Sequence, residues 1–365
     1  MKTAYVNSKL FNGDRFIYDV AVLTDDGIII DLVHASEVPA DYVQKDSGNK
    51  ILSPAFIDLQ IYGGLGKMFS HEPGTEAISA TKEYCNQGGA GYFMITMATN
   101  SIEKFLQGIE AVKQNWKEGG EGCLGLHLEG PYLNSAKKGA HIEKYIHQPT
   151  EKEIEQLLEA GEGIIKMMTL APEQCEPSII KRLQQAGILV SAGHTDATYQ
   201  QAMDAFDAGL PVATHLFNAM SPFLHRAPGM VGAIFDHPRA KCSIVCDGIH
   251  VNFAAVRISH RIMQDRLFFI TDAVTEVKEG EYIHLLQGDR YTLPDGTLSG
   301  SSLTMLKCVY NGINYAGIPH EVALSMATSI PASLIDPSLM IGKIEKGYKA
   351  QFALIDENYE TVELV

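Results

Sequence analysis

Residues 125–134 read Gly-Leu-His-Leu-Glu-Gly-Pro-Tyr-Leu-Asn, and the predicted fold follows from this stretch. The apolar run 124–128 alternates and stops at Gly130, which is typical of a buried strand that ends in a turn. Glu129 therefore stands at the C-terminal tip of a strand. Because an unpaired carboxylate is costly to remove from water, we expect a cation beside it.

Three further polar residues end other apolar runs. His194 follows Leu-Val-Ser-Ala-Gly, His215 follows Val-Ala-Thr, and Asp272 follows Leu-Phe-Phe-Ile-Thr. Loop or helix-start residues come after each of them. These side chains are candidates to share one cation with Glu129.

Strand-like runs alternate with helical patterns through the middle of the chain. The predicted strands are 55–61, 92–97, 123–128, 165–170, 187–191, 211–215, 243–247 and 267–271. The predicted helices between them include 75–87, 101–117, a helix from Thr150 to near Gly161, 177–186 and 195–208. The pattern Thr150-Glu-Lys-Glu153 is a capping box, and glycines follow the helix ends. Eight strands that alternate with helices predict an α/β fold of the (β/α)8 TIM-like barrel type.

A doubly wound open sheet is the alternative fold. Such a sheet more often carries a glycine-rich phosphate turn that opens a helix after its first strand. Here the first strand is followed by Tyr62-Gly-Gly-Leu-Gly66, with no helix start behind it. The barrel is therefore the favoured prediction.

Both ends of the chain have a β pattern. Residues 1–52 contain short β-branched runs separated by Asn-Gly and Asp-Asp-Gly turns, and the last residues resemble them. Neither end is long enough to form a stable sheet alone. We therefore predict one small β-sandwich domain from residues 1–52 and 337–365, with the catalytic barrel at 53–336.

Composition excludes several partners. The 365 residues carry a formal net charge of −15, which argues against nucleic acid or an anionic membrane surface. The six cysteines are scattered without a CxxC pair, as expected of reduced core residues in a cytoplasmic protein. We expect neither a signal peptide nor a membrane span, because no apolar run is long enough.

In a barrel, the C-terminal ends of all strands converge on one mouth. One carboxylate and two imidazoles, from Glu129, His194 and His215, suit Zn²⁺ and leave a position for water. Fe²⁺, Co²⁺ and Mn²⁺ are the alternatives. A single strand-end histidine is more often a structural hydrogen-bonding group, and Asp272 could instead cap a helix. Four such residues at four strand ends favour a metal site.

The motifs around these residues resemble those of the N-acetylglucosamine-6-phosphate deacetylase family, within the amidohydrolase superfamily. The resemblance runs from about Leu52 to the C-terminus. The matching motifs are Pro54-Ala-Phe-Ile-Asp58, His127-Leu-Glu-Gly-Pro-Tyr-Leu-Asn134, Lys138-Gly-Ala-His141, Ser191-Ala-Gly-His-Thr195, Thr214-His-Leu-Phe-Asn-Ala-Met220, Arg226-Ala-Pro-Gly229, Asp247-Gly-Ile-His-Val251, Thr271-Asp-Ala273 and Leu298-Ser-Gly-Ser-Ser-Leu-Thr-Met305.

The resemblance implies hydrolysis of the acetamide of N-acetylglucosamine 6-phosphate to glucosamine 6-phosphate and acetate. It implies that Glu129, His194 and His215 hold the metal, that Asp272 is the general base, and that His141 contacts the acetamide oxygen. It also implies a homodimer and leaves open whether the partner subunit completes the phosphate site. The residues expected to bind the substrate are His141, Asn218, Ala219, Arg226, His250 and Leu303.

The first predicted strand departs from the superfamily. Many members carry His-x-His there, which holds a second metal, whereas this chain has Gln60-Ile61-Tyr62. A neutral amide binds transition ions weakly, and a phenol must lose a proton near pH 10 to bind well. We therefore predict one divalent ion per chain, with Gln60 hydrogen-bonded to water at the second position.

Two other functions remain open from the sequence. One is another amide hydrolase of the superfamily, such as a dihydroorotase-like enzyme. Those enzymes generally use the histidine pair of the first strand and a modified lysine, which are not visible here. The other is a non-catalytic barrel that serves as a scaffold, which the retention of Glu129, His194, His215 and Asp272 disfavours.

Overall fold

The computed structural model describes residues 1–365, and its centre is a barrel of eight parallel strands. The strands are β8 (Phe56–Ile61), β11 (Ala90–Ala98), β12 (Cys123–Glu129), β13 (Ile165–Leu170), β14 (Leu189–Ala192), β15 (Val212–Ala213), β16 (Lys241–Ile244) and β17 (Leu267–Phe269). Each is hydrogen-bonded to the next along the chain. All eight predicted runs overlap these strands, so the predicted barrel is confirmed.

The barrel closes between β17 and β8 through the residues that follow β17. Ala273 pairs with Ile61 in a parallel bridge. The N–H of Asp272 donates to the carbonyl of Gln60 (3.0 Å), and that of Tyr62 donates to the carbonyl of Ala273 (2.9 Å). This closure excludes the doubly wound open sheet.

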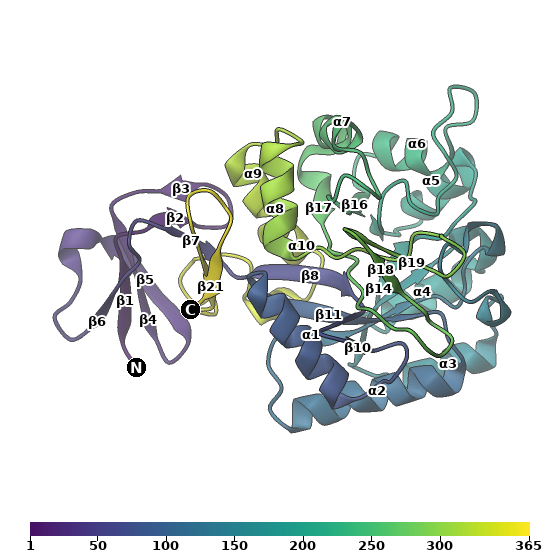
Figure 1. Ribbon diagram of the computed structural model, residues 1–365, viewed down its shortest axis with the longest axis horizontal. Helices are drawn as coiled ribbons and strands as arrows, with labels where there is room; N and C mark the ends of the chain where they lie inside the picture. The colour runs from purple at the N-terminus through teal and green to yellow at the C-terminus, as the bar shows by residue number, and fades with distance from the viewer.

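Helices surround the barrel (Figure 1). They are α1 (Thr75–Gln87), α2 (Ile102–Lys117), α3 (Glu151–Ala160), α4 (Pro177–Gln185), α5 (Tyr199–Asp207), α6 (Gly229–Asp236), α7 (Phe253–Met263), α8 (Met305–Asn314), α9 (His320–Ala327) and α10 (Ser329–Ala332). Short 3-10 helices lie at Ala35–Glu37, Ser135–Lys137, Glu143–Tyr145, Pro172–Gln174, Gln264–Arg266 and Pro337–Leu339. The capping box of Thr150 and Glu153 is formed at the start of α3.

The prediction for α5 was wrong at its start. The helix begins at Tyr199, capped by Thr198, and not at Thr195. Thr195 instead forms an isolated parallel bridge with Met220. Its backbone N–H donates to the carbonyl of Ala219 (3.1 Å), and its hydroxyl donates to Glu173 (2.5 Å). These contacts tie the segment after β14 to neighbouring loops of the barrel mouth.

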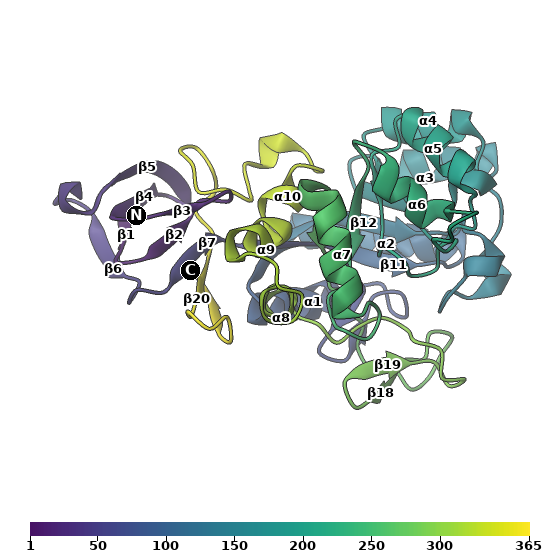
Figure 2. The ribbon, with the colours of Figure 1, turned by 90° about the horizontal axis from the view of Figure 1, so that it is seen from above.

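The two ends of the chain form two small sheets beside the barrel (Figures 1 and 2). Their strands are β1 (Thr3–Val6), β2 (Lys9–Phe11), β3 (Phe16–Ile17), β4 (Val20–Asp25), β5 (Ile28–His34), β6 (Val43–Asp46), β7 (Ile51–Pro54), β20 (Phe352–Ile355) and β21 (Val362–Leu364). One sheet has the order β5-β4-β1-β6 and the other β21-β20-β7-β2-β3. The C-terminal β20 pairs antiparallel with β7, so both ends build the predicted β-sandwich. We propose that it forms a domain divided from the barrel near residues 52 and 337.

Two hairpins lie outside the barrel and the sandwich. They are formed by β9 (Gly63–Gly64) with β10 (Lys67–Met68), and by β18 (Leu285–Gln287) with β19 (Arg290–Thr292). Figure 2 shows that the β18–β19 hairpin stands out from the barrel. All six cysteines are buried and free. None of the helices combines the length and the apolar character that spanning a membrane would require.

Asp58 of β8 gives a test of the barrel closure. It is fully buried and accepts hydrogen bonds from the N–H and the hydroxyl of Thr271. Burial raises its pKa from 3.8 to about 7, although the bonds from Thr271 oppose the shift. The folded chain therefore holds a proton that the unfolded chain releases, so this contribution to stability falls as pH rises from about 4 to about 7.

We expect Asp58→Asn to remove this dependence, because an amide does not titrate in that range. The difference in melting temperature, variant minus wild type, should be more positive at pH 8 than at pH 5. Both proteins should be measured in chelator, so that metal binding does not contribute. The same difference at both pH values would contradict the role given to burial.

Candidate active site

The C-terminal ends of the barrel strands surround a cavity of about 170 Å³. Glu129, His194, His215 and Asp272 all line it, so the structure brings together the four strand-end residues. The cavity is also lined by residues expected to bind the substrate, namely His141, Asn218, Ala219 and His250. We therefore treat it as the candidate active site.

Three ligand atoms form a small triangle on one side of this cavity. Glu129 Oε1 lies 3.0 Å from His215 Nε2 and 3.4 Å from His194 Nε2, and the two Nε2 atoms are 3.1 Å apart. A tetrahedral Zn²⁺ with bonds of about 2.0–2.1 Å keeps its ligand atoms about 3.3 Å apart. The triangle therefore fits one ion of that size.

The hydrogen bonds of His194 set its tautomer. Its Nδ1 lies 2.8 Å from the backbone carbonyl oxygen of Lys137, which can only accept a hydrogen bond. Nδ1 therefore carries the proton, and the lone pair of Nε2 faces Glu129 and His215. A backbone carbonyl on the far nitrogen is the usual way in which a metal-binding histidine is oriented.

Glu129 is buried and fully partnered. Its Oε2 accepts hydrogen bonds from the Tyr62 hydroxyl and from His141 Nε2 (3.1 Å). Its Oε1 also accepts a bond from Gln60 Nε2 (2.9 Å). Both oxygens thus accept hydrogen bonds, and Oε1 is also turned toward His194 and His215.

His141 is placed as a donor. The backbone N–H of Thr99 donates to its Nδ1 (3.2 Å), and the Thr99 hydroxyl lies 2.8 Å from the same atom. Since an N–H can only donate, Nδ1 bears the lone pair and Nε2 bears the proton. Glu129, His141 and His194 also bring ligand atoms within 4.8 Å of one another. The protonated Nε2 nevertheless favours His215 over His141 as the third ligand.

The close approach of Thr99 depends on Gly130. This glycine has φ +91°, and a Cβ there would lie 2.1 Å from the Thr99 hydroxyl. Any other residue would displace Thr99 and, with it, His141. The turn after Glu129 therefore helps to position the histidine on the opposite side of the carboxylate.

Three of the strand-end residues adopt left-handed backbone conformations. His194 has φ 48°, His215 has φ 37°, and Asp272 has φ 54°. Such conformations are unfavourable for residues other than glycine, and they concentrate at functional sites. Here the left-handed turn comes at the point where each strand ends at the cavity.

Asp272 is linked to Glu129 through the side-chain amide of Gln60. Its Oδ1 accepts a hydrogen bond from Gln60 Nε2 (2.8 Å), the same nitrogen that contacts Glu129. The Gln60 amide oxygen accepts a bond from the Thr214 hydroxyl, next to His215. The amide nitrogen of Gln60 thus contacts both carboxylates directly, and its hydrogen bond to water stays a prediction. A donor between them leaves little room for a second cation.

The electrostatics follow from burial and these contacts. Burial alone would raise the pKa of Glu129, but the charges and hydrogen bonds of His141 and His194 hold that pKa well below its ordinary value. Burial, reinforced by the neighbouring histidine His141, lowers the pKa of His194 to about 4. Burial also raises the pKa of Asp272, and the negative charge of Glu129 adds to that effect while His215 opposes it. The cavity thus holds a charged carboxylate, a neutral imidazole and a second carboxyl with raised basicity.

His250 also lines the cavity. Its Nδ1 lies 2.6 Å from a carboxylate oxygen of Asp247, whose other oxygen accepts the backbone N–H groups of Ile249 and His250. Nδ1 therefore donates, which fixes the ring. Asn218 and Ala219 line the same cavity, and Ala219 has φ 50°.

Two predicted site residues lie outside this cavity. Arg226 is exposed and has neither an ion pair nor a hydrogen bond. Leu303 is buried, and its backbone contacts Ser301 (3.0 Å) and the Tyr84 hydroxyl (3.0 Å). The roles given to them stay predictions.

The sequence analysis did not single out Tyr282 and His284, which also line the cavity. They come from the segment between β17 and α8, which returns to the barrel mouth. The Tyr282 hydroxyl donates to the carbonyl of Thr99. The segment has no strand-end pattern, so only the folded chain reveals its place.

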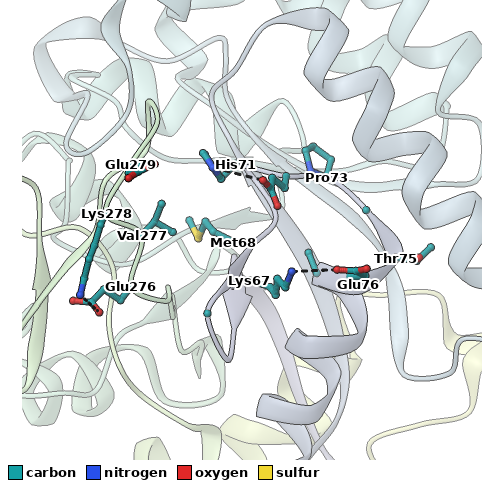
Figure 3. A pocket seen from close by; sticks show the side chains of 14 residues that line it. Lys67, Met68, His71, Pro73, Thr75, Glu76, Glu276, Val277, Lys278 and Glu279 are labelled. Carbon is teal, nitrogen blue, oxygen red and sulfur yellow. Dashed lines mark hydrogen bonds and ion pairs between the residues drawn. The ribbon is translucent and has the colours of Figure 1, made fainter.

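A larger hollow of about 610 Å³ lies between the segments 66–77 and 276–279 (Figure 3). Both lysines of this hollow form ion pairs with neighbouring glutamates. Lys67 pairs with Glu76 (3.1 Å), and Lys278 pairs with Glu276 (3.2 Å). It offers no cluster of metal ligands and no surplus of positive charge, so the cavity around Glu129 remains the candidate active site.

A (β/α)8 barrel with a carboxylate and paired imidazoles at its C-terminal mouth defines the class of metal-dependent hydrolase barrels. Residues 51–364 match the Amidohydrolase family, and the chain belongs to it. The family is metal-dependent, which agrees with the ligand triangle.

Several proteins are similar to this chain over almost its whole length. It is 33% identical to the N-acetylglucosamine-6-phosphate deacetylase of Haemophilus influenzae, over 99% of this chain and 97% of that protein. It is 32% identical to the N-acetylgalactosamine-6-phosphate deacetylase of a Shewanella species, over 93% and 88%. The crystal structure of the N-acetylglucosamine-6-phosphate deacetylase from Pasteurella multocida superposes with a TM-score of 0.94, at 29% identity, over 99% of this chain and 97% of that one.

A second solved structure contains a ligand. It is a mutant of the Mycobacterium smegmatis N-acetyl-D-glucosamine-6-phosphate deacetylase in complex with N-acetyl-D-glucosamine-6-phosphate. Its TM-score is 0.91 and its identity is 25%, over 99% of this chain and 96% of that one.

We expect Tyr62→Phe to weaken metal binding by about 10- to 100-fold, because it removes a donor that orients Glu129. Chelator competition measures this affinity directly. The matched control is Tyr282→Phe, which removes the hydroxyl of another buried tyrosine of the cavity wall that contacts no metal-ligand residue. Equal affinities for wild type and Tyr62→Phe would show that Tyr62 does not orient the carboxylate.

Proposed function

We propose that the protein hydrolyses the acetamide of N-acetylglucosamine 6-phosphate, giving glucosamine 6-phosphate and acetate, as part of amino-sugar catabolism or recycling. The observation that carries this proposal is the cavity itself, which Glu129, His194, His215 and Asp272 line together. The similar proteins of Haemophilus influenzae and Pasteurella multocida are N-acetylglucosamine-6-phosphate deacetylases. We further propose a cytoplasmic location, since the six cysteines are free and buried.

We propose one divalent ion per chain, held by Glu129, His194 and His215. Zn²⁺ is favoured by the ligand set of two imidazoles and one carboxylate, with Fe²⁺, Co²⁺ or Mn²⁺ as alternatives. The Gln60 amide between Glu129 and Asp272 supports the count, because an N–H donor repels a second cation. When bound, the ion supplies Lewis acidity that polarises the amide carbonyl and makes water more acidic.

The residues of the chain perform the proton transfers. Asp272 takes a proton from the attacking water and returns it to the departing nitrogen, a task that suits a carboxyl of raised basicity. His141 Nε2 donates to Glu129 Oε2 in the free site. When substrate binds, this N–H donates instead to the acetamide oxygen, where negative charge develops. Gln60 holds Asp272 Oδ1 and so leaves the other oxygen of that carboxylate for the proton.

The phosphate of the substrate needs local positive charge in an acidic protein. We propose that His250, fixed by Asp247, and the segment of Asn218 and Ala219 bind it. Arg226 adds a fork of donors that suits phosphate. Arg226 is exposed and forms no ion pair within the chain, so a structural role in a surface ion pair does not account for this arginine.

Two other functions were considered. A dihydroorotase-like enzyme is disfavoured, because Gln60 and Tyr62 occupy the positions of the histidine pair. A non-catalytic scaffold is disfavoured, because ligands and base stand together in a closed cavity. A specific observation favours a related substrate: the similar proteins include N-acetylgalactosamine-6-phosphate deacetylases, so the epimeric sugar is the second candidate.

The test of the function is acetate release from N-acetylglucosamine 6-phosphate, with and without chelator. We expect release that the chelator abolishes and that Zn²⁺ restores, with about one ion per chain by metal analysis. The galactosamine epimer and dihydroorotate serve as comparison substrates. Release from neither amino sugar, by protein with its metal bound, would refute the proposal.

We expect Asp272→Asn to lower kcat by about 10²- to 10⁴-fold, the usual contribution of a positioned acid–base group. Metal content should remain near one ion per chain, because three other residues hold the ion. Steady-state kinetics with metal analysis of the same preparation measure both. A variant with bound metal and nearly normal kcat would show that Asp272 is not the base.

We expect Arg226→Ala and His250→Ala mainly to weaken the binding of the 6-phosphorylated substrate. The ratio of kcat/KM for N-acetylglucosamine 6-phosphate to that for free N-acetylglucosamine should fall steeply in both variants, since each loses a charged or polar partner of the phosphate. If the ratio is unchanged in both, neither residue belongs to the phosphate site.

We propose a homodimer through an apolar surface beside Arg226. This surface comprises Phe223, Leu224, Ile258 and Ile262, which are 59%, 53%, 54% and 45% exposed. Such a contiguous exposed patch is typical of an interaction site. It borders a hollow of about 610 Å³ between α5, α6 and α7. A second copy seated there would carry its Arg226 toward the neighbouring subunit.

Sedimentation and subunit mixing test this arrangement. Ile258→Glu should produce monomers, and the exposed Lys152→Glu of α3 serves as the control. Mixed dimers of Asp272→Asn with Arg226→Ala should regain activity if Arg226 acts across the interface, because one of their sites is then complete. A wild-type monomer would refute the dimer.

A further inference from the structure

His284 forms part of the wall of the active-site cavity and has no role in the proposed chemistry. It is only 3% exposed, and it lines the same cavity as Asp272. Its ring lies parallel to that of Tyr282, with centroids 6.3 Å apart and planes at 5°. The backbone of His284 pairs with Val277 in both directions (2.9 and 3.0 Å), so the side chain is held in a fixed position.

The contacts of His284 define its tautomer. Nδ1 lies 3.1 Å from the carbonyl oxygen of Ser299 and 3.0 Å from its hydroxyl. A carbonyl oxygen can only accept, so Nδ1 carries a proton. Burial lowers the pKa of the ring to about 4, which keeps it neutral near pH 7. Nε2 therefore bears a lone pair.

Nε2 of His284 has no hydrogen-bond partner among the protein atoms. The large majority of buried polar atoms are paired, because an unsatisfied acceptor loses its bonds to water without replacement. The neighbouring wall residues Val274 and Leu298 show that apolar side chains fit this wall. A buried acceptor at such a position points to a donor that arrives with the substrate.

We propose that His284 is a specificity-determining residue, whose Nε2 accepts a hydrogen bond from a hydroxyl of the bound sugar. This inference rests on the proposed function and adds a subsite to it. The sugar is a polyol, so each hydroxyl that does not carry the phosphate can donate. A neutral imidazole that accepts would leave the hydroxyl oxygen free for other contacts.

The surroundings of His284 indicate which hydroxyls are concerned. The adjacent Tyr282 donates to the carbonyl of Thr99, and Thr99 holds His141 at the acetamide oxygen. Through Tyr282 and Thr99 this wall is linked to His141, which we place at the acetamide end. The hydroxyls that flank the acetamide are those on C1 and C3. The C4 hydroxyl, which distinguishes glucosamine from galactosamine, is not the one assigned to His284.

The test combines a substitution of His284 with substrate analogues that each lack one hydroxyl. We measure kcat/KM of wild type and His284→Leu on N-acetylglucosamine 6-phosphate, its 1-deoxy analogue and its 3-deoxy analogue. Wild type should lose about 10- to 100-fold on one analogue, the range expected when a buried partner is left unpaired. His284→Leu should lose about as much on the parent substrate and show no further loss on that analogue.

Two further variants separate recognition from folding. His284→Gln keeps an acceptor near the position of Nε2, and it should restore part of the discrimination. His237→Leu is the control for loss of a buried histidine outside the cavity, because His237 is 1% exposed and its Nε2 makes no hydrogen bond, with Asp207 Oδ1 3.4 Å away. That variant should lower the melting temperature and leave the discrimination unchanged.

The two levels of the proposal fail differently. If wild type with bound metal hydrolyses none of the three compounds, the proposed function is wrong and the subsite falls with it. If wild type is active but His284→Leu and His284→Gln discriminate against both analogues as strongly as wild type, His284 only fills the wall. The same conclusion follows if wild type accepts both analogues as well as the parent.

Discussion

The burial of one carboxylate is the constraint on which the site depends. Glu129 is 1% exposed, and its ionised form is tolerable only because its two oxygens have different partners. Tyr62 and His141 donate to Oε2, whereas Oε1 is turned toward His194 and His215. Desolvation would otherwise favour the protonated acid. The ion that we propose at Oε1 would complete this arrangement, so the contacts that stabilise the buried carboxylate also orient it for a metal.

The closure of the barrel extends this constraint to the base. Asp272 follows the last strand, and its N–H is bonded to the carbonyl of Gln60 on the first. The side chain of Gln60 then contacts both carboxylates. A shift of β17 relative to β8 would therefore separate Asp272 from Glu129. The closure of the barrel and the placement of the proposed base thus depend on the same contacts, and Asp58 adds to them by accepting hydrogen bonds from Thr271.

The protein is acidic, but the groups that line its cavity suit an anionic substrate. The chain has a net charge of −15, yet the cavity presents histidines toward the proposed substrate. His250 is fixed by Asp247, and His141 is fixed by Thr99, so each ring presents a defined edge. Recognition here depends on oriented donors and acceptors more than on overall charge. His284 extends the same principle to a neutral group of the sugar.

The sequence by itself determined the barrel, the sandwich built from both ends, and the four strand-end residues. Period-two runs that stop at glycine or histidine are local signals, and parallel strands must bring their ends to one mouth. Only the tertiary structure decided the start of α5, the direct contacts of Gln60 and the places of Tyr282 and His284. These depend on which loop atoms meet across the mouth. Arg226 marks the limit most clearly, because its motif predicts a phosphate ligand while its position in one chain is outside the cavity. Sequence patterns encode the periodicity of single elements, whereas contacts between segments far apart in the chain arise only when the core packs.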